Sequence, residues 1–104
     1  MNIMGMIAKF LEGMSQCETM TMADRLVILG RDLRHMDHCE HPESCYLCRV
    51  NKQKIKENVP QWAQDLARTM NKNPAMQFRA VFENLCAQEI ADRLGVTLNI
   101  DEAA

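Results

Sequence analysis

The sequence predicts an all-α protein, a small bundle of four or five helices in a single domain over residues 1–104. Apolar residues recur at three- and four-residue spacing along most of the chain, which is typical of helices that bury one side. Strand-like alternation is confined to "VTLNI", residues 96–100, and a lone strand has nothing to pair with. A chain of 104 residues can form one hydrophobic core and leaves too little for a second.

The first helix is expected in the N-terminal segment, "MNIMGMIAKFLEGMSQ". Its apolar stripe consists of Ile3, Ile7, Phe10, Leu11 and Met14. Methionines are concentrated in and just after this segment, and their flexible side chains are typical of adaptable binding faces. We therefore expect a Met-rich surface here that binds a partner or a second copy of the chain. Lys9 follows the apolar stretch, whereas a secretion signal carries its positive charge first.

The next helix is predicted in "TMADRLVILGRDLRHM", residues 21–36. Thr21 and Asp24 have the spacing of a capping box, which opens a helix. The apolar stripe consists of Leu26, Leu29, Leu33 and Met36. Gly30 lies inside this pattern, where it either weakens the helix by about 1 kcal/mol relative to alanine or lets another helix approach closely.

Two further helices are predicted on either side of Pro60. "CYLCRVNKQKIKENV", residues 45–59, is the more polar of the two. Proline interrupts the pattern because it cannot donate the helical hydrogen bond. The pattern resumes in "QWAQDLARTMNK", where Trp62, Leu66 and Met70 share one face.

The last predicted helix runs from Pro74 to Leu94. Asn73 before Pro74 is a good start signal, because proline is well suited to the first helical position. Gly95 is a natural stop. The apolar positions of this segment are Phe78, Val81, Phe82, Leu85 and Ile90. Outside the stripes, Cys17 and Cys86 are expected to be small buried apolar residues.

A cluster of potential metal ligands lies between two of the predicted helices. "HMDHCEHPESCYLCR", residues 35–49, contains all three histidines and three of the five cysteines. Cys45 and Cys48 have the spacing of a zinc knuckle. His35 and Cys39 are four residues apart, so they face the same side if the preceding helix continues that far. The predicted ligands are therefore His35, Cys39, Cys45 and Cys48, with His41 as the alternative fourth ligand.

These ligands predict a zinc-bound loop joining two helices, with the zinc in a structural role. Four nitrogen and sulfur donors suit tetrahedral Zn²⁺, although iron and Cu(I) also accept sulfur-rich sites. Three thiolates make the ion a poor Lewis acid, and Glu40 and Glu43 are expected to face solvent. No phosphate-binding glycine loop or catalytic triad is evident, so we do not expect an enzyme. Replacing Cys45 or Cys48 with serine is expected to cost metal and fold together, because zinc binding contributes directly to folding in small modules.

A run of basic residues follows the knuckle in "RVNKQKIK". It contains Arg49, Lys52, Lys54 and Lys56. A basic helix beside a zinc site is typical of several nucleic-acid-binding modules, and Arg31 and Arg34 would extend the patch. However, lysines at alternating positions scatter around a helix, so a solvated face is the simpler interpretation.

Together these features predict a zinc-stabilised interaction protein: an adaptor, inhibitor or regulatory subunit that binds a protein partner. The alternative is a zinc-containing regulator that binds nucleic acid through the basic helix. A net charge of −2 favours neither nucleic acid nor a membrane, and no apolar run is long enough to cross a bilayer. Five cysteines, an odd number, without a recognisable secretion signal predict a reducing compartment, the cytoplasm.

Overall fold

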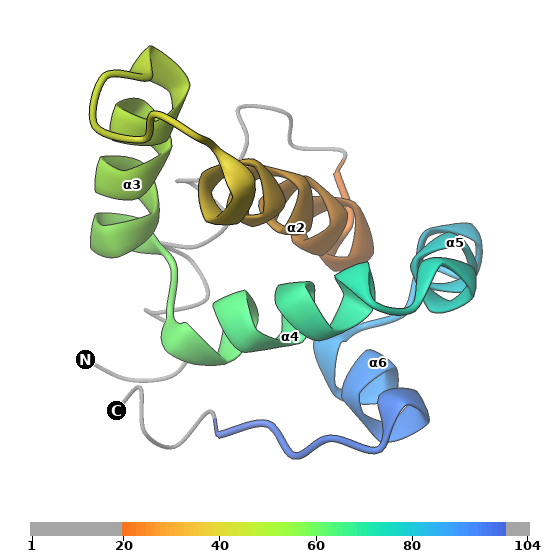
Figure 1. The fold of residues 1–104 in the computed structure, drawn as a ribbon. Helices are drawn as coiled ribbons and strands as arrows, with labels where there is room; N and C mark the ends of the chain where they lie inside the picture. The colour runs from red at the N-terminus through yellow and green to blue at the C-terminus, as the bar shows by residue number, and fades with distance from the viewer. Residues whose placement is uncertain (1–19, 100–104) are drawn as a thin grey trace.

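The computed structural model describes residues 20–99, which form five helices and no strand (Figure 1). The helices are α2 (Met22–His38), α3 (Tyr46–Asn58), α4 (Gln61–Asn71), α5 (Pro74–Phe82) and α6 (Ala87–Leu94). The prediction of an all-α bundle is therefore confirmed, and residues 96–99 form no strand. The expected N-terminal helix, its Met-rich surface and Cys17 lie outside the described residues.

Helix α2 begins as its sequence predicts. The Thr21 side chain accepts a hydrogen bond from the Asp24 backbone N–H at 3.1 Å, and the Asp24 carboxylate accepts one from the Thr21 N–H at 3.2 Å. This capping box satisfies two N–H groups that have no partner within the helix. The stripe is confirmed, since Leu26, Leu29 and Leu33 are fully buried.

Helix α2 packs most extensively along α4, and Gly30 lies where the two helices meet. A Cβ atom at Gly30 would lie 2.7 Å from Asn71 Oδ1 and 3.2 Å from the Ala67 carbonyl oxygen. The Asn71 amide donates a hydrogen bond to the Gly30 carbonyl at 2.8 Å. Gly30 therefore allows the close approach of helices that the sequence analysis considered.

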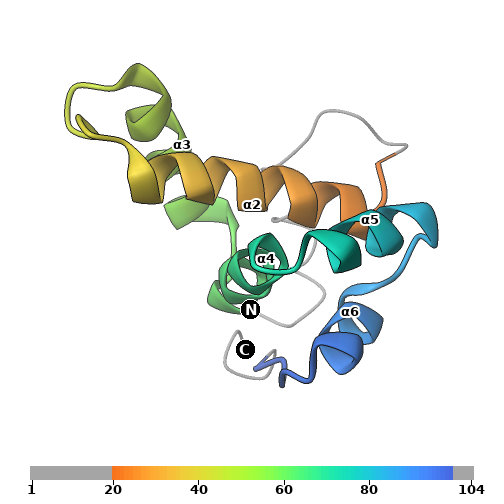
Figure 2. The same ribbon diagram turned by 45° about the vertical axis from the view of Figure 1, so that its right-hand side comes forward.

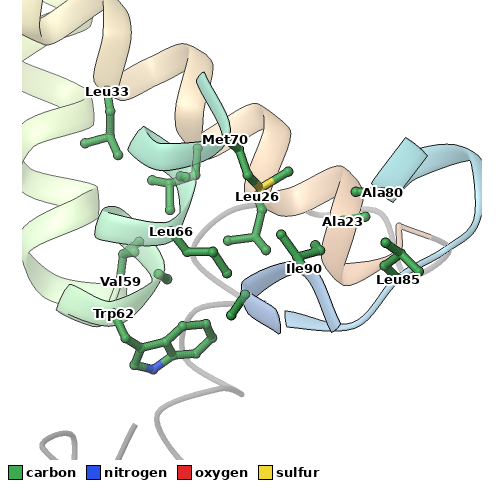
Figure 3. Close-up of a cluster of buried hydrophobic side chains, with 14 of the residues drawn as sticks. Ala23, Leu26, Leu33, Val59, Trp62, Leu66, Met70, Ala80, Leu85 and Ile90 are labelled. Carbon is green, nitrogen blue, oxygen red and sulfur yellow. The ribbon is translucent and has the colours of Figure 1, made fainter. Parts of the chain in front are cut away.

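The hydrophobic core lies between α2, α4, α5 and α6 (Figure 3). Trp62, Leu66 and Met70 of α4 are buried, as predicted. Leu26 of α2 and Ile90 of α6 complete the centre of this cluster. Gly95 ends α6 in the left-handed conformation, with φ 73°, as the stop signal predicts.

The prediction of one helix from Pro74 to Leu94 is wrong, because the chain turns between α5 and α6. Asn84 adopts a positive φ of 54°, and the Leu85 N–H donates to the Ala80 carbonyl at 3.0 Å. This turn directs Leu85 into the core but leaves Phe78 and Phe82 on the surface, 72% and 77% exposed.

Two further expectations for this segment are corrected by the turn. Val81, expected in the apolar stripe, is 38% exposed. Cys86, expected to be buried, is exposed at the residue before α6, where its thiol donates to the Glu89 carboxylate at 3.2 Å.

Helix α3 lies to one side of the bundle, away from α5 and α6 (Figures 1 and 2). Of its thirteen residues, only Cys48 and Ile55 are buried, and Val59 adds a third apolar contact just after the helix ends. Among residues 20–99, no helix combines the length and the hydropathy that a membrane crossing requires.

Candidate metal centre

The four predicted ligands lie at the junction of α2 and α3. His35 is in the last turn of α2, and Cys39 is the residue that ends this helix, in an extended conformation. Cys45 is the residue before α3, and Cys48 is in its first turn. The helix ends therefore fix the backbone on both sides of the loop, which is the condition for a preformed site.

A tight turn brings the two pairs of ligands together. The backbone N–H groups of Ser44 and Cys45 both donate to the His41 carbonyl, at 3.2 and 2.9 Å. Pro42 lies inside this turn, where its fixed φ helps the chain to reverse. The loop folds back over the end of α2, as the short spacing between Cys39 and Cys45 predicts.

The ligand atoms of His35, Cys39, Cys45 and Cys48 all lie within 4.8 Å of one another. His35 Nε2 is 3.5 Å from Cys45 Sγ. Zinc bond lengths of ~2.3 Å to sulfur and ~2.0–2.1 Å to nitrogen place tetrahedral ligands about 3.5–3.8 Å apart. Only small side-chain movements would therefore close a tetrahedral shell, and this group could hold a metal ion.

The short distances between the ligand atoms shift the pKa values of two cysteines. The imidazole of His35, followed by the backbone N–H of Cys48, lowers the pKa of Cys45 to about 6. Burial, followed by the neighbouring Cys39 and Cys45 sulfurs, raises the pKa of Cys48 to about 12. Repulsion among the sulfurs thus favours one thiolate over several, and a divalent cation would remove this repulsion.

The other potential ligands of the loop do not join this group. His38 and His41 are exposed, and the four-ligand group that the structure brings together contains His35 and not His41. Glu40 and Glu43 are also exposed, as expected for residues that face solvent. The group consists of one imidazole and three thiols, with no carboxylate.

The basic residues of α3 divide into two sets. Arg49, Lys52 and Lys56 are exposed, and their spacing of three and four residues places them on one side of the helix. Lys54 is half-buried on another side, where its charge acts on the carboxyl group of Asp32 in α2. The alternating lysines therefore do not form one stripe, as predicted, although Arg49, Lys52 and Lys56 share a face.

Comparison with protein-family models, with curated proteins and with solved structures finds no match.

An aromatic pair that belongs to the predicted apolar stripe lies on the surface of the structure. The rings of Phe78 and Phe82 stack with their centroids 6.0 Å apart and an interplanar angle of 10°. The polar pair Glu83 and Asn84 was the available signal, because asparagine tolerates positive φ and often ends a helix. A helix that ends there no longer aligns both phenylalanines with Ile90.

Proposed function

We propose that the protein is a zinc-stabilised helical interaction protein whose metal is structural. The chemistry of the four donors supports zinc, because three thiols and one imidazole form a typical closed tetrahedral shell. Cys48 is buried with 4% of its surface exposed, so the ion would be partly shielded from solvent. A closed shell leaves no position for a catalytic water, so the proposal does not include an enzymatic activity.

The weak packing of α3 supports a structural role for the ion. Ile55 and Val59 anchor only the C-terminal end of this helix in the core. Each buried aliphatic side chain contributes about 1.5–3 kcal/mol. In the N-terminal half of α3 only Cys48 is buried, and it is not part of the core cluster. Ligands from both sides of the loop would anchor that half to the end of α2.

The exposed aromatic pair of α5 is the observation that carries the interaction role. Phe78 and Phe82 expose about three quarters of their surfaces, and aromatic side chains are enriched at the centres of protein interfaces. Val81 exposes an apolar side chain on the same helix. We propose that a protein partner with an apolar groove covers this surface, and that the chain acts as an adaptor, inhibitor or regulatory subunit in the cytoplasm.

A nucleic-acid-binding regulator is the second candidate, because Arg49, Lys52 and Lys56 share one exposed face. Salt separates the two functions. Affinity for phosphates falls steeply as the salt concentration rises. The affinity for a protein partner that buries Phe78 and Phe82 would change little with salt.

Metal content is the first test of the proposal. The protein is purified without chelators under reducing conditions, and its metals are measured by elemental analysis. We expect one equivalent of zinc in the natural chain and none in a Cys45→Ser/Cys48→Ser variant. A metal-free natural chain with the same helix content and melting temperature would contradict the structural role.

Capture of partners at high salt tests the interaction role. The tagged protein and a Phe78→Ala/Phe82→Ala variant are compared in pull-downs from the native host, analysed by mass spectrometry. A Tyr46→Ala/Leu47→Ala variant is the matched control, since it removes two exposed apolar residues from α3. We expect the control to retain a stoichiometric partner that the α5 variant loses. Equal recovery by both variants would exclude the α5 surface.

A further inference from the structure

A second surface lies at the C-terminal end of α2, where two shallow hollows adjoin. The first hollow is lined by Arg31, Arg34, His35, His38 and Cys39. The second hollow is lined by Arg34, Asp37, His38, Arg68, Asn71 and Lys72. Arg34 and His38 line both hollows, so the two form one continuous surface.

The acidic group on this surface is already neutralised. Asp37 accepts two hydrogen bonds from the Arg68 guanidinium, at 3.0 and 3.1 Å. Arg31, Arg34 and Lys72 are exposed, and none of them forms an ion pair with the acids of the described chain. The carboxyl of Asp32 is half-buried; burial raises its pKa, whereas the charges of Arg31 and Lys54 lower it, but it forms no ion pair with Arg31 in the described chain. Three solvated cations therefore remain for an external anion.

These cations are arranged in a row. Arg31 and Arg34 are three residues apart, which places them on one side of α2, about 4.5 Å apart along its axis. Lys72, the residue that ends α4, extends the row across the second hollow. A single small anion would occupy only part of this length, whereas a nucleic-acid strand presents a phosphate about every 3.4 Å of duplex axis.

We propose that Arg31, Arg34 and Lys72 bind the phosphate backbone of a nucleic acid. The recognition is electrostatic and independent of sequence, because phosphate contacts position a protein without reading bases. The cations themselves supply the positive charge, since a divalent ion held by three thiolates would add a net negative charge. This surface shares no residue with the basic face of α3 or with the aromatic pair of α5.

Fluorescence anisotropy with a labelled 20-base-pair duplex of arbitrary sequence tests the proposal on the full-length, zinc-loaded protein. Three phosphate contacts predict a fall in affinity of about 40-fold between 50 and 200 mM salt. An Arg31→Ala/Arg34→Ala/Lys72→Ala variant should bind at least tenfold more weakly at 50 mM salt and lose most of this salt dependence. Its melting temperature should be unchanged, because all three side chains are exposed.

An Arg49→Ala/Lys52→Ala/Lys56→Ala variant is the matched control, because it removes the same charge from the exposed face of α3. If the phosphates lie on the surface at the end of α2, this variant should lose clearly less affinity than the Arg31/Arg34/Lys72 variant. No binding by the natural chain at 50 mM salt, or an equal or larger loss in the α3 variant, would overturn the proposal. So would equally tight binding of polyglutamate, which would indicate an acidic protein, or displacement by millimolar inorganic phosphate at constant ionic strength.

This result is independent of the α5 interaction. The Phe78→Ala/Phe82→Ala variant should bind the duplex as the natural chain does, and the Arg31/Arg34/Lys72 variant should retain its protein partner at high salt. Each proposal can therefore fail without the other.

Discussion

The two ends of the molecule are held together in different ways. At one end, α4, α5 and α6 pack with the first turns of α2 around a cluster that includes Leu26, Leu66 and Ile90. At the other end (Figure 2), the last turn of α2 lies beside the first turn of α3. Cys and His side chains gather there, and little apolar surface is buried. One end is stabilised by packing, and we propose that a metal ion stabilises the other.

Under this proposal, a metal ion lets a short chain extend a helix beyond its own core. Burial of apolar surface stabilises a fold only where several helices or strands pack around one core. Helix α3 contacts mainly α2 and is too polar to form a core of its own. A bound metal needs only four donors, so it can hold two helix ends where no third layer is present.

Loss of the metal ligands should have the largest effect. In a Cys48→Ser variant we expect less than one equivalent of zinc and a loss of several kcal/mol of stability, because zinc binding contributes on the order of 10 kcal/mol in small modules. For a domain of this size, this loss corresponds to a melting temperature lower by roughly 15 °C or more. Circular dichroism and elemental analysis would measure both effects.

Hydrogen exchange on the same variant would locate the damage. Amides of α3 should lose protection first, while those of α4 keep most of theirs. A Ser44→Ala variant is the control, because it changes the loop without removing a ligand. If α4 lost protection together with α3, the two ends would form a single cooperative unit.

Truncation of the core should have the next largest effect. Leu66 is 2% exposed, and a buried leucine replaced by alanine costs about 2–5 kcal/mol. We expect a Leu66→Ala variant to melt at a lower temperature and still bind one equivalent of zinc. Release of the metal under native conditions would show that the ligand geometry depends on the core.

The sequence predicts the well-packed elements and the ligands best. The stripes of α2 and α4 and the capping box at Thr21 follow from local spacing, which a single helix fixes by itself. The metal group is predictable for the same reason, since His35 and Cys39 are four residues apart and Cys45 and Cys48 are three apart. Spacing alone does not decide whether His35 or His41 is the fourth ligand, because the choice depends on where α2 ends.

The errors concern features that apolar periodicity does not encode. Phe78 and Phe82 fit an apolar stripe, but Asn84 turns the chain and a separate α6 brings Ile90 to the core. The basic surface at the end of α2 combines Arg31 and Arg34 with Lys72, and its acid, Asp37, is neutralised by Arg68 from α4. No periodicity within one segment carries this information.

The contact between α2 and α4 allows a smaller test of the packed end. A Gly30→Ala change places a Cβ atom 2.7 Å from Asn71 Oδ1, so the Asn71 side chain has to move and its hydrogen bond to the Gly30 carbonyl weakens. Overpacking costs about 1–3 kcal/mol, and the better helix propensity of alanine offsets up to about 1 kcal/mol. We expect a net loss of about 1–2 kcal/mol in chemical denaturation.

A double-mutant cycle with Asn71→Ala would identify the cause of this loss. If the clash is responsible, the Gly30→Ala change should cost less in the Asn71→Ala background. Full additivity of the two changes would instead indicate a general effect on α2.

The smallest expected effect concerns the exposed ion pairs that join α5 to α6. Glu83 contacts Arg93 at 3.3 Å and Arg79 at 3.1 Å, and these guanidinium groups, Arg93 first, lower the pKa of the carboxyl group. Because the folded state favours the ionised form, this stabilisation is present above the ordinary pKa of about 4.3 and is lost as the pH falls through the lowered value.

A Glu83→Gln variant should therefore melt a few degrees lower at most at pH 7, since exposed ion pairs contribute little. The difference from the natural chain should shrink as the pH falls from about 5 to 3, and high salt should reduce it at pH 7. A pH-independent difference would mean that Glu83 acts through the turn at Asn84 and not through its charge. In either case zinc binding at pH 7 should be unchanged, because the pair lies at the end of the molecule that packing stabilises.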